Sequence, residues 1–219
     1  MRSRTRATAS SASRRRKMGR SEPGGVAPTR FLGLAAVIVV ADQITKRMAV
    51  DVLSPAYVPH EVLGDWFRLT LVYNPGAAFG LHLGSYSRWI FMVLNVVAVV
   101  TMWRLYRASP PDAIWRVRAL LCVTGGAFGN FIDRIISPRG VVDFLDVGVG
   151  TWRWPTFNLA DIAVSTGAIL LAIVLWNEEE ERIAEATAVP SPESPTSPRR
   201  TRRARATRGR RAPTPSRSM

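Results

Sequence analysis

Two aspartates, Asp143 and Asp161, lie on either side of a short segment that joins two apolar stretches of the sequence. Asp143 follows one long apolar segment. Asp161 stands at the start of the next, where Pro155 and Asn158 are typical of a helix N-terminus. If both segments cross a membrane, the two carboxylates meet at one membrane face. Carboxylates at that depth are costly and commonly mark functional sites, so this pair is the first candidate for chemistry.

Two carboxylates that share a dry pocket cannot both ionise cheaply, so one of them keeps a proton near neutral pH. The charged carboxylate can then take a proton from water while the neutral one donates a hydrogen bond to a carbonyl, as in an aspartic protease. A coupled pair titrates as a unit, so the sequence does not assign the general base. The single Cys122 and the isolated His60 and His82 argue against a disulfide, a metal centre or a competing nucleophile.

Further polar residues have the spacing to support such a pair. Asn158 precedes Asp161 by three positions and shares its helical face, and Asn130, Asp133 and Arg134 share another face. The amides and the guanidinium could direct hydrogen-bond donors toward the carboxylates or a substrate carbonyl. An ordinary ion pair at the membrane surface would account for Asp133 and Arg134, but it would leave Asn130 unexplained.

Two more polar groups occur nearer the N-terminus, and each has a simpler explanation. Asp42 and Lys46 are four residues apart on one helical face, which suits either a tolerated interfacial salt bridge or a part of the site. Asn74 precedes Pro75 and Gly76, the pairing that a type II turn needs at its centre. Asn74 is then either a solvated turn residue or an amide directed toward the carboxylates.

Apolar stretches of the length that crosses a membrane recur along the chain. Gly125 and Gly129, at GxxxG spacing, should let a second helix approach one of them closely. The run WFRLTLVYN alternates as a surface strand or hairpin does. We therefore predict an all-α membrane protein of four transmembrane helices with a small extracytoplasmic β-rich subdomain, at residues 57–80, between helices 1 and 2. The four predicted spans are 31–52, 89–106, 113–136 and 157–176.

The charge of the chain is concentrated at its ends. Residues 1–30 hold nine Lys and Arg against one acid, and residues 190–219 hold nine Arg against one acid. Both ends lack large apolar residues, so we expect a disordered arm at 1–30, a membrane domain at 31–180, and a polar and then disordered tail at 181–219. Positive-inside counting places both ends in the cytoplasm and the candidate site on the outer face. Anionic lipid is the expected contact of the basic ends, and no nucleic-acid partner is expected.

Five short motifs, in this order, resemble those of the bacterial lipoprotein signal peptidases, also called signal peptidase II. They are DQITK (42–46), NPGAAFG (74–80), GGAFGNFIDR (125–134), VVDF (141–144) and FNLAD (157–161). The resemblance covers about residues 31–176. It implies an inner-membrane aspartyl endopeptidase that cuts prolipoprotein signal peptides on the N-terminal side of a diacylglyceryl-modified cysteine, without a metal or other cofactor. It also implies sensitivity to the cyclic peptide globomycin.

The same resemblance implies roles for individual residues. The catalytic pair maps to Asp143 and Asp161, and the supporting residues map to Asp42, Lys46, Asn74, Gly76, Asn130, Asp133, Arg134, Asn158 and Ala160. The expected partners are lipidated prolipoproteins and membrane lipids, and the expected state is a monomer. A small proton-coupled transporter or a non-enzymatic membrane scaffold is the alternative. A transporter should carry polar residues near the bilayer midplane, where the second and fourth spans are apolar apart from Asn95, Ser165 and Thr166.

Overall fold

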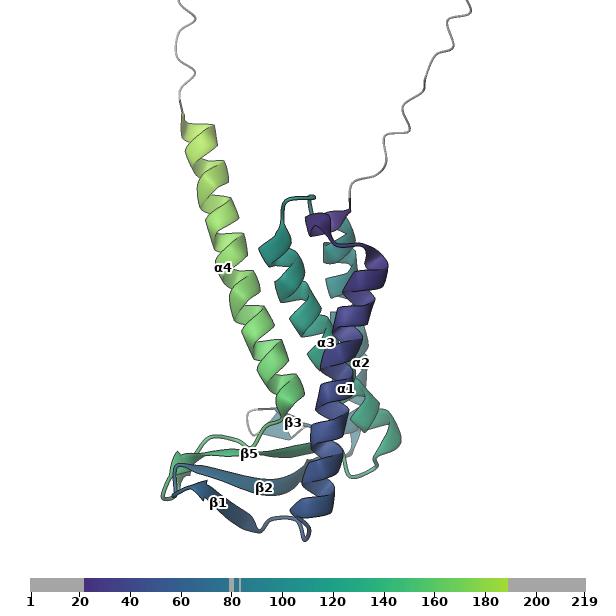
Figure 1. Cartoon of the computed structure of the whole chain (residues 1–219), viewed down its shortest axis with the longest axis vertical. Coiled ribbons are helices and arrows are strands. Elements are labelled where there is room, and N and C mark those ends of the chain that lie inside the picture. The colour runs from purple at the N-terminus through teal and green to yellow at the C-terminus, as the bar shows by residue number, and fades with distance from the viewer. Residues whose placement is uncertain (1–21, 79–80, 83, 189–219) are drawn as a thin grey trace, which may run out of the picture.

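The computed structural model describes residues 22–78, 81–82 and 84–188, and these form a helical bundle standing on a small sheet (Figure 1). The long helices of this part of the chain are α1 (Pro28–Val52), α2 (Ser87–Ala108), α3 (Ile114–Ile136) and α4 (Leu159–Thr187). Two short 3-10 helices, η1 (Pro23–Gly25) and η2 (Gly84–Tyr86), precede α1 and α2. The start of α1 and the end of α4 lie at the opposite end of the bundle from the sheet.

Among the described residues, three helices are long and apolar enough to cross a membrane: α2, α3 and α4. These agree with the second, third and fourth predicted spans to within a few residues, except that α4 continues to Thr187, past the expected domain boundary at 180. The first predicted span forms α1, but its second half carries Asp42, Lys46, Arg47 and Asp51. The described part of the chain is therefore that of a multi-pass membrane protein, with α1 as an unusually charged helix.

Helix α3 is the centre of the bundle and packs against α1, α2 and α4. Its small residues permit this. A side chain added at Gly126 would place its Cβ 2.3 Å from the backbone oxygen of Ala160 on α4. A Cβ at Gly129 would lie 2.6 Å from the carboxylate of Asp42 on α1. A Cβ at Gly125 would likewise lie 2.8 Å from Ile38 of α1, so the approach of a second helix predicted from the GxxxG spacing is confirmed, and Gly126 adds a close contact with α4.

The sheet corrects the prediction of a local β-rich subdomain between the first two helices. Its antiparallel order is β1-β2-β5-β6, and a separate two-stranded ladder joins β3 to β4. Only half of its strands come from the predicted region, because β5 and β6 lie between α3 and α4. Two acids within β5 break the apolar alternation that would have revealed a strand. The strands are β1 (Pro59–Leu63), β2 (Phe67–Asn74), β3 (Ala77–Ala78), β4 (Leu81–His82), β5 (Val141–Val149) and β6 (Trp152–Arg153).

Two clusters of buried side chains hold the ends of the bundle. Near the sheet, Ala49 and Leu53 in the last turn of α1 pack on Leu71 of β2 and Phe144 of β5. This contact connects the first helix to the strand that carries Asp143. The rest of the outer surface of α1, α2 and α4 is largely exposed and apolar, as expected of helices that face lipid.

At the opposite end, Phe31, Tyr106, Val117 and Leu120 form the second cluster. The hydroxyl of Tyr106 donates to the backbone oxygen of Val26 at 2.8 Å, so the last part of the predicted 1–30 arm is folded onto the bundle. The predictions for residues 1–21, 79–80 and 189–219 lie outside the described residues.

Candidate active site

Asp143 is positioned by the pairing of β5 with β2, where it lies opposite Val72. Next to Asp143, the other edge of β5 forms hydrogen bonds with α3 and with the residue that caps α4, and not with another strand. The backbone N–H of Val142 donates to the Asp133 carboxylate at 3.2 Å, and its carbonyl accepts from the amide of Asn158 at 3.3 Å. Asp143 is left with only 2% of its surface exposed.

Asp161 is positioned by the start of α4. The Asn158 side chain caps the helix by accepting from the Asp161 backbone N–H at 2.9 Å, and the Asp161 carboxylate accepts from the Asn158 backbone N–H at 3.1 Å. This reciprocal capping box confirms the helix start predicted from the sequence, and the helix begins at Leu159. It also fixes the direction in which the Asp161 side chain projects.

Three asparagine amides donate to the two carboxylates. Asn158 Nδ2 donates to Asp143 Oδ1 at 2.6 Å, and Asn74 Nδ2 donates to Asp143 Oδ2 at 3.1 Å. Asn130 Nδ2 donates to Asp161 Oδ1 at 2.8 Å. Asn130 and Asn158 thus connect α3 and α4 to both acids.

The side-chain oxygen of each asparagine already accepts a hydrogen bond from another donor. The amide N–H₂ group is therefore the part that faces the carboxylate. The Asn74 oxygen accepts from the Gly76 backbone N–H at 3.0 Å, which gives Asn74 a structural role in the turn as well as in the site. The Asn130 oxygen accepts from Lys46 Nζ at 2.9 Å. Gly76 has φ +120°, so the turn that Pro75 and Gly76 form depends on a glycine.

Lys46 is the centre of a buried charged cluster behind the site. Its ammonium lies 2.8 Å from the carboxylate of Asp42 and 2.9 Å from that of Asp133. Asp42 also accepts from the backbone N–H of Ala160 at 2.9 Å. The predicted Asp42–Lys46 pair therefore exists, but it is buried between three helices rather than placed at an interface. A lysine flanked by two acids is compensated in a way that a lone buried charge is not.

Arg134 completes the set of predicted residues. Its Nη1 donates to the backbone oxygen of Asn130 at 3.1 Å, and only 9% of its surface is exposed. Within the part of the chain that the structure describes, its Nε makes no hydrogen bond. A buried guanidinium N–H without a partner is costly.

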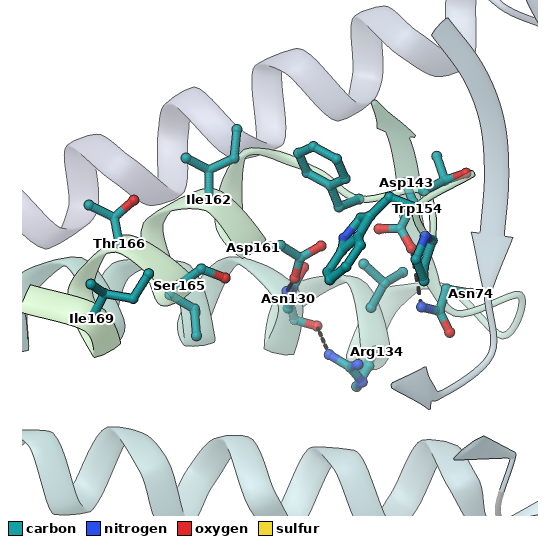
Figure 2. A pocket seen from close by; sticks show the side chains of 15 residues that line it. Asn74, Asn130, Arg134, Asp143, Trp154, Asp161, Ile162, Ser165, Thr166 and Ile169 are labelled. Carbon is teal, nitrogen blue, oxygen red and sulfur yellow. Dashed lines mark hydrogen bonds between the residues drawn. The ribbon is translucent and has the colours of Figure 1, made fainter. Parts of the chain in front are cut away.

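Both carboxylates line one cavity of about 480 Å³ (Figure 2). Asn74, Asn130 and Arg134 lie on its wall near the acids, and Trp154 stands beside Asp143. From there the cavity extends along α4. The wall in this direction is formed by Ile162, Val164, Ser165, Thr166 and Ile169.

The electrostatic state of the pair follows from this enclosure. Burial is the largest effect on Asp143, and the neighbouring charge of Asp161 adds to it. Together they raise the pKa of Asp143 from 3.8 to about 7, against the opposing effect of hydrogen bonds from Asn74 and Asn158. A proton is therefore available within the pair near neutral pH, as predicted from two carboxylates in one dry pocket.

Five of the eleven predicted site residues line the cavity: Asn74, Asn130, Arg134, Asp143 and Asp161. Lys46, Gly76 and Asn158 form hydrogen bonds with residues that line it. Asp42, Asp133 and Ala160 lie behind these, where Lys46 pairs with both acids and Ala160 donates to Asp42. The sequence reasoning missed Gln43, whose amide donates to the Asp133 carboxylate at 2.9 Å and to the Gly129 carbonyl at 3.3 Å. Its place next to Asp42 was the only available signal. Among the described residues, no group of His, Cys, Asp and Glu side chains has the geometry to hold a metal ion.

The chain is similar to known proteins in sequence and in structure. Residues 34–177 match the family model described as signal peptidase (SPase) II. The lipoprotein signal peptidase of Burkholderia mallei (strain SAVP1) is 39% identical over 156 residues, which cover 70% of this chain and 90% of that protein. The lipoprotein signal peptidase of Paraburkholderia phymatum is 40% identical over 153 residues, covering 69% and 90%.

Two solved structures, each described as a bacterial membrane enzyme obtained by the in meso method, are also similar. The first, at 2.3 Å resolution, superposes with a TM-score of 0.61 at 26% identity and covers 70% of this chain and 92% of the other. The second, at 1.9 Å, gives a TM-score of 0.60 and covers 71% and 96%. With a family model that matches most of the described residues and relatives that align over nearly their whole length, the chain belongs to the signal peptidase II family.

Proposed function

We propose that this protein is an aspartic endopeptidase that removes signal peptides from diacylglyceryl-modified prolipoproteins, cutting on the N-terminal side of the lipidated cysteine. Membership of the signal peptidase II family and relatives named lipoprotein signal peptidase support the substrate. The observation that carries the aspartic mechanism is that Asp143 and Asp161 line the same buried cavity.

The chemistry uses one proton shared by the pair. With its pKa near 7, Asp143 holds this proton and donates it as a hydrogen bond to the scissile carbonyl. Asp161 takes a proton from a water molecule, whose oxygen then attacks the carbonyl carbon. When the tetrahedral intermediate collapses, the C–N bond breaks and Asp161 returns its proton to the amine of the cysteine residue. The roles refer to the state in which Asp143 is protonated, because the two groups titrate together.

Arg134 is suited to stabilise the charge that develops on the carbonyl oxygen. Its side chain lines the same cavity as the two carboxylates, and only 9% of its surface is exposed. A donor held in place before the reaction stabilises an oxyanion without reorganisation. The amide of Asn130 meanwhile keeps a hydrogen bond on Asp161 at 2.8 Å, which orients the carboxylate that accepts the proton.

We place the enzyme in the bacterial inner membrane with four spans and both termini in the cytoplasm. The buried charges of α1 do not prevent it from spanning, because Asp42 and Lys46 are 0% and 2% exposed, pair with each other, and Lys46 also pairs with Asp133 of α3. Arg104 and Arg107 at the end of α2 lie at the end of the bundle away from the sheet, and the positive-inside rule makes that end cytoplasmic. The sheet and the cavity mouth then face the outer leaflet.

The cavity supports a lipid-anchored substrate. Its carboxylates lie at the level where the sheet meets the helices, and its wall along α4 is apolar at Ile162, Val164 and Ile169. The signal peptide and the acyl chains would lie against this wall, with the cleaved bond at the acids. Globomycin would compete for the same cavity, the lipids would surround the exposed helix faces, and the enzyme would act as a monomer without a cofactor.

The test is cleavage of a purified lipidated precursor in detergent, followed by release of the signal peptide. Asp143→Asn and Asp161→Asn should each lower the rate at least about 1,000-fold, because the proton donor or acceptor is lost. Asp146→Asn is the matched control: it is a buried acid of the same strand, but its partners are Arg153 and Thr70 and it does not line the cavity. EDTA should have no effect. Full activity of either cavity variant would refute the aspartic mechanism.

A further inference from the structure

The apolar helix α2 contains one polar residue near its middle that the proposed mechanism does not use, Asn95. With its amide oxygen toward α3, Asn95 accepts hydrogen bonds from the Phe131 backbone N–H and from Arg134 Nη1, each at 3.2 Å. The opposite orientation would set the amide N–H₂ against two donors. Asn95 is half-buried, an amide in a membrane helix is costly unless it has partners, and here both partners belong to the last turns of α3.

Asn95 is one of three residues of α2 that contact Arg134. Arg88, Phe91 and Asn95 follow one another at intervals of three and four and so share one face of the helix. Arg88 donates to the backbone oxygen of Arg134 at 2.6 Å and to that of Ile135 at 3.0 Å. The ring of Phe91 lies 5.4 Å from the Arg134 guanidinium carbon. This face of α2 therefore contacts Arg134 at three places: its backbone oxygen, the guanidinium group and the terminal nitrogen Nη1.

The same face also contacts the other wall of the site. A Cβ added at Gly76 would lie 3.1 Å from the ring of Phe91 and 2.9 Å from the Cβ of Ser87. Gly76 belongs to the turn that fixes the Asn74 amide on Asp143. Helix α2 has no carboxylate in the cavity, yet it lies against both Arg134 and the turn of Asn74.

We propose that Asn95 is a positioning residue that holds the Arg134 guanidinium in the cavity wall, where the guanidinium contacts the substrate carbonyl. The inference rests on the proposed function, since it gives Asn95 a role only through a substrate that Arg134 contacts. Asn95 occupies one terminal nitrogen as an acceptor, and the Asn130 carbonyl also accepts from that nitrogen at 3.1 Å. These two acceptors hold one terminal nitrogen and so fix the orientation of the guanidinium in the cavity wall.

Two nearly isosteric substitutions separate this role from simple packing. Asn95→Leu removes the acceptor, and Asn95→Asp keeps it. If Asn95 positions Arg134, the leucine variant should lose about tenfold in kcat/KM with KM little changed, and the aspartate variant should stay within about threefold of wild type. If Asn95 only packs, the order reverses, because leucine is favoured in a membrane helix and a carboxylate there is costly.

The measurement is steady-state cleavage of the lipidated precursor by the full-length protein in detergent, with folding checked by thermal unfolding. Thr101→Val, which removes a polar group from an exposed position of the same helix, is the control and should match wild type. A leucine variant as active as wild type, or more active than the aspartate variant, would overturn the positioning role. Measuring Asp143→Asn in the same assay distinguishes a failure of the Asn95 inference from a failure of the proposed function. If Asp143→Asn is inactive, a failure at Asn95 refutes only this inference, whereas an active Asp143→Asn enzyme refutes the proposed function.

Discussion

Replacing Asp143 by asparagine should change the stability of the protein in opposite directions at acidic and alkaline pH. Burial raises the pKa of Asp143 from 3.8 to about 7 in the folded protein. Between these two values the folded state binds more protons than the unfolded state, so the free energy of unfolding of the wild type falls as the pH rises. Above about pH 7 the fall ends, because Asp143 is ionised in both states.

The size of the effect follows from the difference between the two pKa values. A shift from 3.8 to about 7 corresponds to roughly 4 kcal/mol of lost stability between pH 4 and pH 8. An amide at this position does not titrate and escapes that loss. It has its own cost, because the carboxylate accepts from both Asn158 and Asn74, and an amide would turn one of these bonds into a contact between two donors. That cost is about 1–3 kcal/mol.

Asp143→Asn should therefore be less stable than wild type by about 1–2 kcal/mol at pH 4, where the wild type has lost little of this stability, and more stable by roughly 2 kcal/mol at pH 8. The measurement is equilibrium unfolding of the purified protein in mild detergent, by titration with a denaturing detergent at both pH values. The cost of the donor contact is common to both, so the change between them isolates the carboxyl group. The same stability difference at pH 4 and pH 8 would mean that burial does not raise the pKa of Asp143.

Two further predictions concern the scaffold. Gly126→Ala should lower the free energy of unfolding by about 1–3 kcal/mol and reduce activity, because the new methyl group would lie 2.3 Å from a backbone oxygen of α4. Gly33→Ala is the control and should have neither effect, because Gly33 faces open space. Equal thermal unfolding of the two variants would contradict the packing account. Removing residues 1–21 and 190–219 should leave the cleavage rate in detergent within about twofold of wild type, since the site is built from the helices and the sheet. Extending the first deletion to residues 1–25 should lower the unfolding temperature, because it removes the η1 turn that bonds to the α2–α3 loop.

Several elements of the site could be predicted because their signals are local in the sequence. The capping box of Asn158 and Asp161 and the pairing of Asp42 with Lys46 depend on residues three or four positions apart, and both exist in the structure. The small residues of α3 likewise indicated close packing, and Gly126 and Gly129 provide it. The catalytic roles assigned to these neighbourhoods remain predictions.

Other elements could not be predicted because their partners are distant in the sequence. The strand that carries Asp143 pairs with β2, and the segment Val141–Val149 alone, with two acids, does not indicate a central strand. Asn95 looked like an isolated exception in an apolar helix until the structure placed it against Phe131 and Arg134. Hydrogen bonds between residues of separate helices and strands leave no local pattern in the amino-acid sequence.

The sequence by itself determined which groups are available: four acids, three amides, a lysine and an arginine, near the ends of apolar segments that segregate them to one side of a membrane. Only the tertiary structure decided the state of those groups. The β2–β5 pairing removes Asp143 from water and raises its pKa to about 7. Lys46, the Gly76 backbone and the start of α4 orient the three amides. Desolvation and amide orientation depend on neighbours brought together by folding, and no spacing along the chain encodes them.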